Sequence, residues 1–325
     1  MKLLVTGGAG FIGSNFIRYI LNKYKDFSIV NLDKLTYAGN LKNLTDVASN
    51  KNYSFIKGDI CNKSIVEKAM KGCDVVINFA AETHVDRAIL DAGSFVKTDV
   101  YGTYILLQAA KKYKIKKFIQ ISSDEVYGSI ERGSFSESSP LNPRNPYSAS
   151  KAGADKLALS FFTTYNLPVL VTRSSNNFGP YQHPEKLIPL FITNLLEGKN
   201  VPLYGDGKNI RDWIYVLDNC EAIDFVMHKG KNGEVYNIAG NNEKQNIDVA
   251  KLILKNLNKD KSYIEYVTDR LGHDRRYSID CKKIKKLGWK SKYKFNASLA
   301  STIKWYKGNT SWWKEIKTNY LRGKK

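Results

Sequence analysis

The sequence predicts an α/β protein: a Rossmann-like, doubly wound parallel sheet followed by a smaller C-terminal α/β substrate domain. Short, almost wholly apolar runs alternate with helical patterns over the first half of the 325-residue chain. This alternation is typical of parallel strands that helices cover on both faces. A glycine-rich turn, Gly7 to Gly13, follows the first apolar run and opens the first helical pattern. Dinucleotide-binding sheets use that arrangement.

Six apolar runs are predicted to form strands, because each is short and is bounded by turn residues or a helical pattern. In chain order they are residues 2–6, 27–32, 53–57, 74–80, 117–122 and 169–173. Helices are expected between them. They follow the glycine turn to about residue 24 and recur near residues 62–71, 94–113 and 147–165.

The chain changes character after Asn176, where prolines interrupt a region with fewer regular repeats. We therefore expect two domains. A cofactor-binding Rossmann domain covers residues 1–175 and is completed by a segment near 213–240 that returns to it. A substrate domain covers residues 176–325.

Composition narrows the function classes. Hydrophobic residues make up 42% of the chain and charged residues 25%, as in ordinary globular proteins. No apolar run approaches the roughly 20 residues that span a bilayer. The N-terminus lacks the order of a signal peptide, so we expect a cytoplasmic protein without a membrane partner. Four scattered cysteines favour neither a metal site nor a disulfide framework.

The formal net charge of +20 is unusual. Its lysines are dispersed, and no RNA-recognition or zinc-finger pattern is present, so nucleic-acid binding is disfavoured. Attraction for an anionic substrate and a lysine-rich proteome remain alternative explanations.

The glycine-rich turn predicts a cofactor site. Gly7, Gly10 and Gly13 permit a tight turn and a close approach to a pyrophosphate at the helix N-terminus. Asp33 ends the second strand about 20 residues further on, where an acid binds the ribose hydroxyls and favours NAD over NADP. The adjacent Lys34 leaves tolerance of a 2′-phosphate open.

A second constellation predicts the chemistry. Tyr147 and Lys151 are four residues apart and lie on one helix face, where a lysine can lower the pKa of a phenol and make it a general base. Ser123, Asp124 and Glu125 follow a strand end. Alcohol oxidation does not need two carboxylates, so the pair indicates a second proton transfer. The alternatives are a solvated turn and a chance Tyr–Lys spacing.

Further segments resemble the extended short-chain dehydrogenase/reductase family and, within it, the dTDP-glucose 4,6-dehydratases. The resemblance runs from Lys2 to about Trp289. Its motifs are residues 33–40, 80–87, 123–128, 146–151, 176–181, 184–189, 204–213 and 272–277.

The resemblance implies conversion of dTDP-glucose to dTDP-4-keto-6-deoxyglucose, in rhamnose-type deoxysugar biosynthesis. Tyr147 would be the base in C4 oxidation, with NAD accepting the hydride. Glu125 would remove the C5 proton, and Asp124 would protonate the departing C6 oxygen. Hydride would then return to C6. Two features depart from the family: Ser123 replaces the usual threonine, and the loop between Glu125 and Tyr147 is shorter than in many members.

The resemblance also implies binding residues, with no metal ligands among them. Cofactor contacts would be Gly7, Gly10, Phe11, Ile12, Gly13, Asp33, Lys34, Thr36, Gly39, Asp59, Ile60, Ala80, Ala81, Thr98, Tyr147 and Lys151. Substrate contacts would be Thr83, Arg87, Asn176, Lys186, Leu187, Pro202, Tyr204, Arg211, Asn237, Arg270 and His273. Arg211 and Arg270 would hold the diphosphate.

Several alternatives stay open. Helices 94–113 and 147–165 would pair as a four-helix bundle in a homodimer, or form only an intramolecular core. A nucleotide-sugar 4-epimerase or uronate decarboxylase would share the tyrosine and lysine, but would not be expected to carry the Asp–Glu pair. A non-catalytic NAD-binding or nucleic-acid-binding protein is the rival from another class. The sequence leaves thymidine against uridine unsettled.

Overall fold

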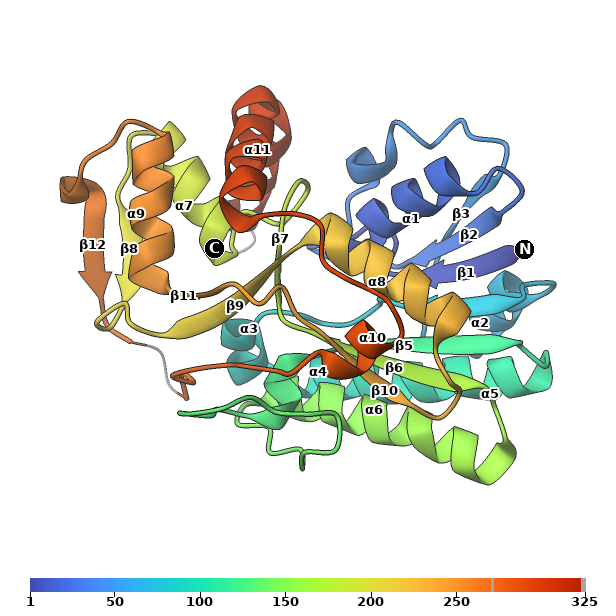
Figure 1. Ribbon diagram of the computed structural model, residues 1–325. Coiled ribbons are helices and arrows are strands. Elements are labelled where there is room, and N and C mark those ends of the chain that lie inside the picture. The colour runs from blue at the N-terminus through green and yellow to red at the C-terminus, as the bar shows by residue number, and fades with distance from the viewer. Residues whose placement is uncertain (270–271, 323–325) are drawn as a thin grey trace.

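The centre of the molecule is a seven-stranded sheet in which all neighbouring strands run parallel (Figure 1). The computed structural model describes residues 1–269 and 272–322. The strand order is β3-β2-β1-β4-β5-β6-β10. The strands are β1 (Lys2–Thr6), β2 (Ser28–Asp33), β3 (Tyr53–Lys57), β4 (Val75–Asn78), β5 (Lys117–Ser123), β6 (Val169–Ser174) and β10 (Val235–Ile238).

Helices cover both faces of this sheet, because its strands are apolar on both sides. Leu3 and Val5 of β1 belong to one buried cluster, whereas Leu4 belongs to another on the opposite face. The first face carries α1 (Phe11–Lys23) and α8 (Val216–Lys229), and the second carries α2 (Lys63–Met70), α5 (Thr103–Lys112) and α6 (Pro146–Tyr165).

A third buried cluster lies beside the sheet, among smaller strands and helices. One small sheet has the order β11-β9-β7, and another pairs β12 with β8. The strands are β7 (Asn176–Phe178), β8 (Val201–Tyr204), β9 (Ile210–Tyr215), β11 (Glu243–Gln245) and β12 (Ile264–Val267). The helices are α7 (Leu187–Leu196), α9 (Asn246–Asn256), α11 (Phe295–Gly308) and α12 (Thr310–Arg322).

The predicted doubly wound parallel sheet is confirmed, and all six predicted strands are present within one or two residues. The helix expected over 94–113 is instead interrupted. Three consecutive segments take its place: α4 (Ala92–Phe95), a π-helical segment (Val96–Gly102) and then α5. π-Helical insertions are frequent at functional sites, and this one lies beside the cavity described below. No helix among the described residues has the length and apolar character needed to cross a bilayer.

Candidate active site

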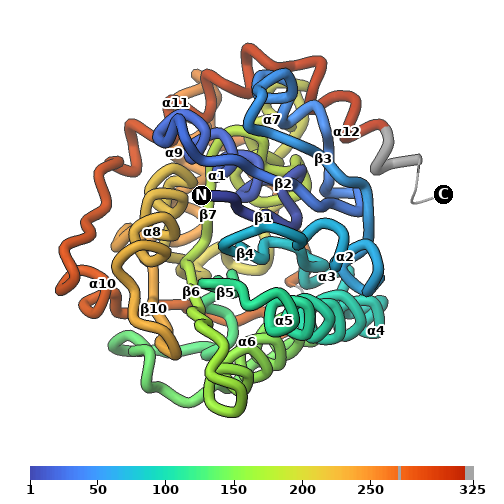
Figure 2. The backbone as a smooth tube through the Cα atoms, turned by 90° about the vertical axis from the view of Figure 1, so that its right-hand side faces the viewer, coloured from blue at the N-terminus to red at the C-terminus, as the bar shows by residue number. Residues whose placement is uncertain are grey.

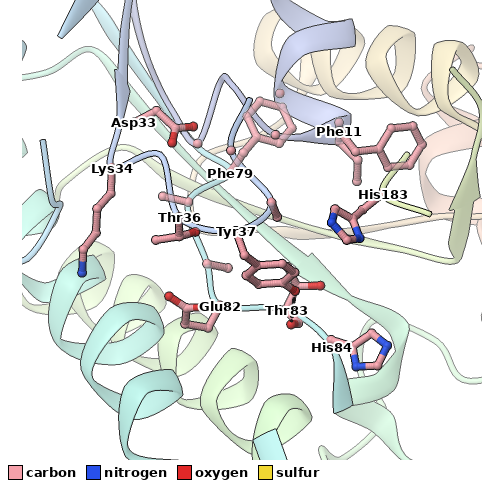
Figure 3. Close-up of a pocket in the computed structure, with 18 of the residues that line it drawn as sticks. Phe11, Asp33, Lys34, Thr36, Tyr37, Phe79, Glu82, Thr83, His84 and His183 are labelled. Carbon is pink, nitrogen blue, oxygen red and sulfur yellow. Dashed lines mark hydrogen bonds between the residues drawn. The ribbon is translucent and has the colours of Figure 1, made fainter. Parts of the chain in front are cut away.

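A cavity of about 950 Å³ lies where the glycine-rich turn, the segment after β4 and the start of α6 meet (Figure 3). Open α/β sheets bind ligands at this carboxyl edge of the strands. Every residue predicted to contact the cofactor lines this cavity, from Gly7 to Lys151.

The glycine turn has the geometry that a dinucleotide requires. Gly7 has a φ of +68°, and a Cβ there would lie 2.6 Å from the backbone nitrogen of Ala80. A Cβ on Gly13 would lie 2.4 Å from the Gly7 carbonyl oxygen. α1 begins after Gly10 without a side-chain cap, which leaves N–H groups of its first turn for an anion. The residues present therefore fit a pyrophosphate.

The acid and the cation after β2 each have a defined partner. The Asp33 carboxylate accepts hydrogen bonds from the backbone nitrogens of Ala9, at 2.9 Å, and Leu35, at 2.8 Å. Burial raises its pKa, and these two N–H groups oppose the rise. The Lys34 ammonium lies 2.8 Å from the Asp59 carboxylate. Lys34 is thus partly neutralised, which weakens the case for a 2′-phosphate.

The two adjacent carboxylates are fixed by a short 3₁₀ helix, η3 (Asp124–Tyr127), that begins where β5 ends. The Ser123 hydroxyl accepts a hydrogen bond from the Glu125 backbone nitrogen and donates one to Asp124 Oδ1, both at 3.2 Å. Asp124 is buried, and its Oδ2 has no hydrogen-bond partner. Burial and, next, the Glu125 charge raise the pKa of Asp124 well above its usual value. This environment favours the protonated acid.

Tyr147 and Lys151 lie on the first turns of α6, which a capping box at Asn145 starts. Burial raises the pKa of the Tyr147 phenol well above its usual value, and the charges of Glu125 and Asp99 add to the rise. The buried Lys151 ammonium donates to the Ile121 carbonyl oxygen at 2.6 Å. The Lys151 ammonium is thus directed at a backbone carbonyl, and its effect on the tyrosine pKa stays a prediction.

Part of the predicted substrate set shares the cavity with the cofactor residues. Thr83, Arg87 and Lys186 line it, and the Lys186 ammonium donates to the Thr83 hydroxyl at 3.1 Å. The Arg87 guanidinium lies 3.5 Å from the centre of the Tyr37 ring and 3.6 Å from Glu185.

Sequence reasoning missed several cavity residues, among them Tyr37, His183 and Glu185. The Tyr37 and His183 rings meet edge to face at 5.4 Å, and Tyr37 donates to the Thr83 carbonyl oxygen at 2.7 Å. All three residues fall inside or beside motifs that the sequence singled out. Each of the three is within a few residues, in sequence, of a residue that was predicted to line the site. That closeness in the sequence is the signal that could have identified them.

The remaining substrate predictions among the described residues lie outside the cavity lining. The buried Arg211 donates to the Asp274 carbonyl oxygen at 2.9 Å and lies 4.2 Å from the Tyr277 ring centre. The Tyr277 hydroxyl is 3.5 Å from Glu125 Oε2, so Arg211 approaches the paired carboxylates through Tyr277.

Five further predicted substrate residues lie on or beside the smaller strands and helices. Asn176 opens β7, and its side-chain oxygen is buried without a hydrogen-bond partner. Leu187 begins α7. Tyr204 ends β8, which Pro202 also occupies, and the Tyr204 ring lies 6.1 Å from that of His273. Arg270 lies outside the described residues.

Asn237 is another residue of the predicted substrate set. It is fully buried on β10. Its side-chain oxygen accepts from the Tyr127 hydroxyl at 2.9 Å, and its amide nitrogen donates to the Phe135 and Asp280 carbonyl oxygens. With its amide bonded at both ends, Asn237 is part of the framework behind the site.

Comparison with known proteins places this geometry among nucleotide-sugar enzymes. The family model described as GDP-mannose 4,6 dehydratase matches residues 4–302. A dTDP-glucose 4,6-dehydratase of Streptomyces niveus is 48% identical over 98% of this chain and 96% of its own length. The low-salt glycan biosynthesis protein Agl12 of Haloferax volcanii is 52% identical over 95% and 99%. A dTDP-glucose 4,6-dehydratase of Streptomyces venezuelae, solved with NAD bound, matches with a TM-score of 0.95 and 47% identity, covering 97% of this chain and 100% of that one.

Proposed function

This chain belongs to the GDP-mannose 4,6 dehydratase family, and we propose that within it the protein is an NAD-dependent dTDP-glucose 4,6-dehydratase of deoxysugar biosynthesis. The observation that carries the proposal is the pair Asp124–Glu125, whose charges act on Tyr147 and which follows closely on Ser122 of the cavity lining. The glycine turn of the same cavity fits a dinucleotide. A dehydratase needs both features, because it couples a redox step to loss of water.

The residues divide the reaction between them. Bound NAD accepts a hydride from C4 of the sugar and later returns it to C6. Tyr147 takes the proton of the C4 hydroxyl, and Ser123 shares that proton through a hydrogen bond. Because its pKa is raised, Tyr147 holds the proton firmly once its phenolate has accepted it, and it can return that proton to the C4 oxygen late in the cycle.

Elimination then needs a base at C5 and an acid at the C6 oxygen. Glu125 is the proposed base. Asp124 is the proposed acid, because burial and the neighbouring Glu125 charge favour its protonated form. Two adjacent carboxyl groups in different environments can thus take opposite roles.

We also propose the two-domain division at residue 175, with α8 and β10 completing the Rossmann domain. The smaller strands and helices would then hold the nucleotide. Arg211 supports this assignment because it is a buried cation close to Glu125 through Tyr277. Asn176 supports it because its side-chain oxygen is buried and unpartnered.

The protein is proposed to act as a cytoplasmic homodimer. Its four cysteine thiols are free, as is usual in a reducing compartment. Exposed apolar side chains occur just before and on α5, where Val96 is 56%, Tyr101 49% and Tyr104 38% exposed. Pairing this face with that of a second copy would bury them.

The test is turnover of purified protein on dTDP-glucose and UDP-glucose, with the products resolved by mass and NMR. We expect dTDP-4-keto-6-deoxyglucose, with a mass loss of one water. A 4-epimerase would instead return a sugar of unchanged mass that keeps its C6 hydroxyl. That result would contradict the proposal, whichever nucleotide were preferred.

A further inference from the structure

The C-terminal helix α12 contributes to the wall of the cofactor cavity. Trp312, Glu315 and Ile316 line it, and their spacing of three and four residues puts them on one face of α12. The matched family model ends at residue 302, so this wall lies beyond the family match. Figure 2 shows the red C-terminal chain passing over the molecule from α11 to α12.

A chain of buried hydrogen bonds joins α12 to the glycine-rich turn. The Trp312 indole nitrogen donates to the Asn43 side-chain oxygen at 2.9 Å, although the two residues are 269 positions apart in sequence. The Asn43 amide nitrogen donates to the Ala9 carbonyl oxygen, also at 2.9 Å. Ala9 lies within the glycine turn that fits the pyrophosphate, so Asn43 connects this turn with α12.

Other contacts hold α12 in this position. The Lys42 ammonium pairs with Glu315 at the exposed end of the contact. On the opposite side, the Trp313 indole donates to the Tyr306 carbonyl oxygen at 2.8 Å. Lys317 pairs with Glu197 at 2.8 Å. α12 therefore spans from the cofactor turn to the third buried cluster.

We propose that α12 is a cofactor-retaining strap: Trp312, anchored through Asn43 to the glycine turn, slows escape of the dinucleotide. The proposal rests on the proposed function, because a dehydratase that regenerates NAD within each turnover must keep the reduced cofactor until hydride returns. An enzyme that exchanged its cofactor every cycle would gain nothing from such a strap.

The test compares Trp312→Phe with a matched control, Trp305→Phe. Both tryptophans belong to the same aromatic group, with rings 5.0 Å apart, but Trp305 does not line the cavity. Bound NAD is quantified in each purified protein, and the NAD dissociation rate is measured after dilution into excess labelled NAD without any sugar.

Loss of the buried hydrogen bond should speed NAD release by roughly fivefold in Trp312→Phe, with Trp305→Phe close to the parent. Equal release rates in the two variants, or an unchanged rate in Trp312→Phe, would overturn the proposal. If Trp312→Phe fails to fold, the charge swap Lys42→Glu with Glu315→Lys decides: each single variant should release NAD faster, and the double variant should recover.

These outcomes are independent of the proposed reaction. A parent protein that holds NAD but leaves dTDP-glucose unchanged would contradict the dehydratase assignment and leave the release measurement intact. A parent that turns over sugar but releases NAD as fast as Trp312→Phe would contradict the strap alone.

Discussion

At the scale of single residues, the paired carboxylates separate this site from a simple alcohol dehydrogenase. We predict that Glu125→Gln keeps C4 oxidation but blocks C5 deprotonation, because a neutral amide cannot accept that proton. Product formation should fall by roughly 10²-fold or more, while NADH accumulates and is seen by its absorbance. Glu131→Gln, an exposed position in the following loop, is the control. Dehydration at the parental rate in Glu125→Gln would remove Glu125 as the C5 base.

Asp99 is a buried carboxyl that the reaction does not use. It accepts hydrogen bonds from Ser150, next to Lys151, at 2.7 Å and from the Glu82 backbone nitrogen at 2.8 Å. Burial raises its pKa to about 6, against the opposing charge of Lys151, and Glu82 adds to the rise. Asp99 therefore connects the segment after β4 with α6, although burial disfavours its ionised form.

The contribution of Asp99 to the stability of the fold should decrease as pH rises. A carboxyl whose folded-state pKa is raised above its unfolded value of about 4 favours folding at low pH, and this contribution is lost as pH rises through about 6. We predict that the melting temperature of Asp99→Asn minus that of the parent increases between pH 4 and pH 7. Groups shared by the two proteins cancel in this difference. A flat difference would mean that the pKa of Asp99 is the same in the folded and unfolded states.

At the scale of single residues, the sequence was most informative about site residues that are separated by a fixed local spacing in the chain. The glycine turn, Asp33 and the Tyr147–Lys151 pair are separated by fixed turns or strands, so their placement follows from local structure. The partner of the Lys151 ammonium was not predictable, because Ile121 offers only a backbone carbonyl. The hydrogen bonds of Asn237 were not predictable either, since its partners, Tyr127 and Asp280, lie 110 and 43 residues away in the chain.

At the scale of secondary structure, a buried ion pair fixes α6 relative to β5 and β6. Arg173 of β6 donates to Asp155 of α6 at 2.9 Å and to the Tyr127 hydroxyl of η3 at 2.7 Å. Asp155 also accepts from Ser122 of β5 at 2.9 Å. The elements that carry Asp124, Glu125 and Tyr147 are thereby tied to one guanidinium.

Removing that guanidinium should be costly. We predict that Arg173→Met lowers the free energy of unfolding by about 3–5 kcal/mol, because Asp155 remains as a buried charge without its partner. Adding Asp155→Asn should restore part of the loss, since the amide carries no charge. Urea unfolding of the parent, both single variants and the double variant measures the coupling. Additive effects of the two substitutions would show that the pair contributes no specific interaction.

Strands were predictable from the sequence because each is a short apolar run, and the run 53–57 matches β3 residue for residue. The break in the helix expected over 94–113 was not, because the π-helical segment depends on tertiary contacts such as the Asp99–Ser150 hydrogen bond. The position of α12 at the cavity depends on the hydrogen bond between Trp312 and Asn43, which are 269 positions apart in the sequence. No local pattern reports a contact of that kind.

At the scale of the whole molecule, the proposed homodimer gives a direct test. Tyr101→Glu places a charge on the exposed face before α5, where the tyrosine is 49% exposed. We predict that it converts a dimer to a monomer in size-exclusion chromatography with light scattering, because a buried unpaired carboxylate opposes association. Tyr266→Glu is the control, since Tyr266 is 61% exposed on β12. A parent protein that is already a monomer would contradict the homodimer.

The net charge of +20 also acts at this scale. A nucleoside-diphosphate sugar is an anion, so a strongly positive protein should attract it over distances that salt screens beyond about 8 Å at physiological ionic strength. We predict that kcat/KM on dTDP-glucose falls by on the order of tenfold as sodium chloride rises from low to high concentration. The value of kcat should change little, because the groups around the bound sugar are buried and less screened.

Sucrose at matched osmolality separates charge screening from water activity, since it should leave kcat/KM unchanged. If kcat/KM is insensitive to salt while kcat falls, the excess lysines do not steer the substrate. The charge would then reflect a lysine-rich composition spread over surfaces remote from the site, and substrate capture would depend on local groups such as Arg211 and Lys186.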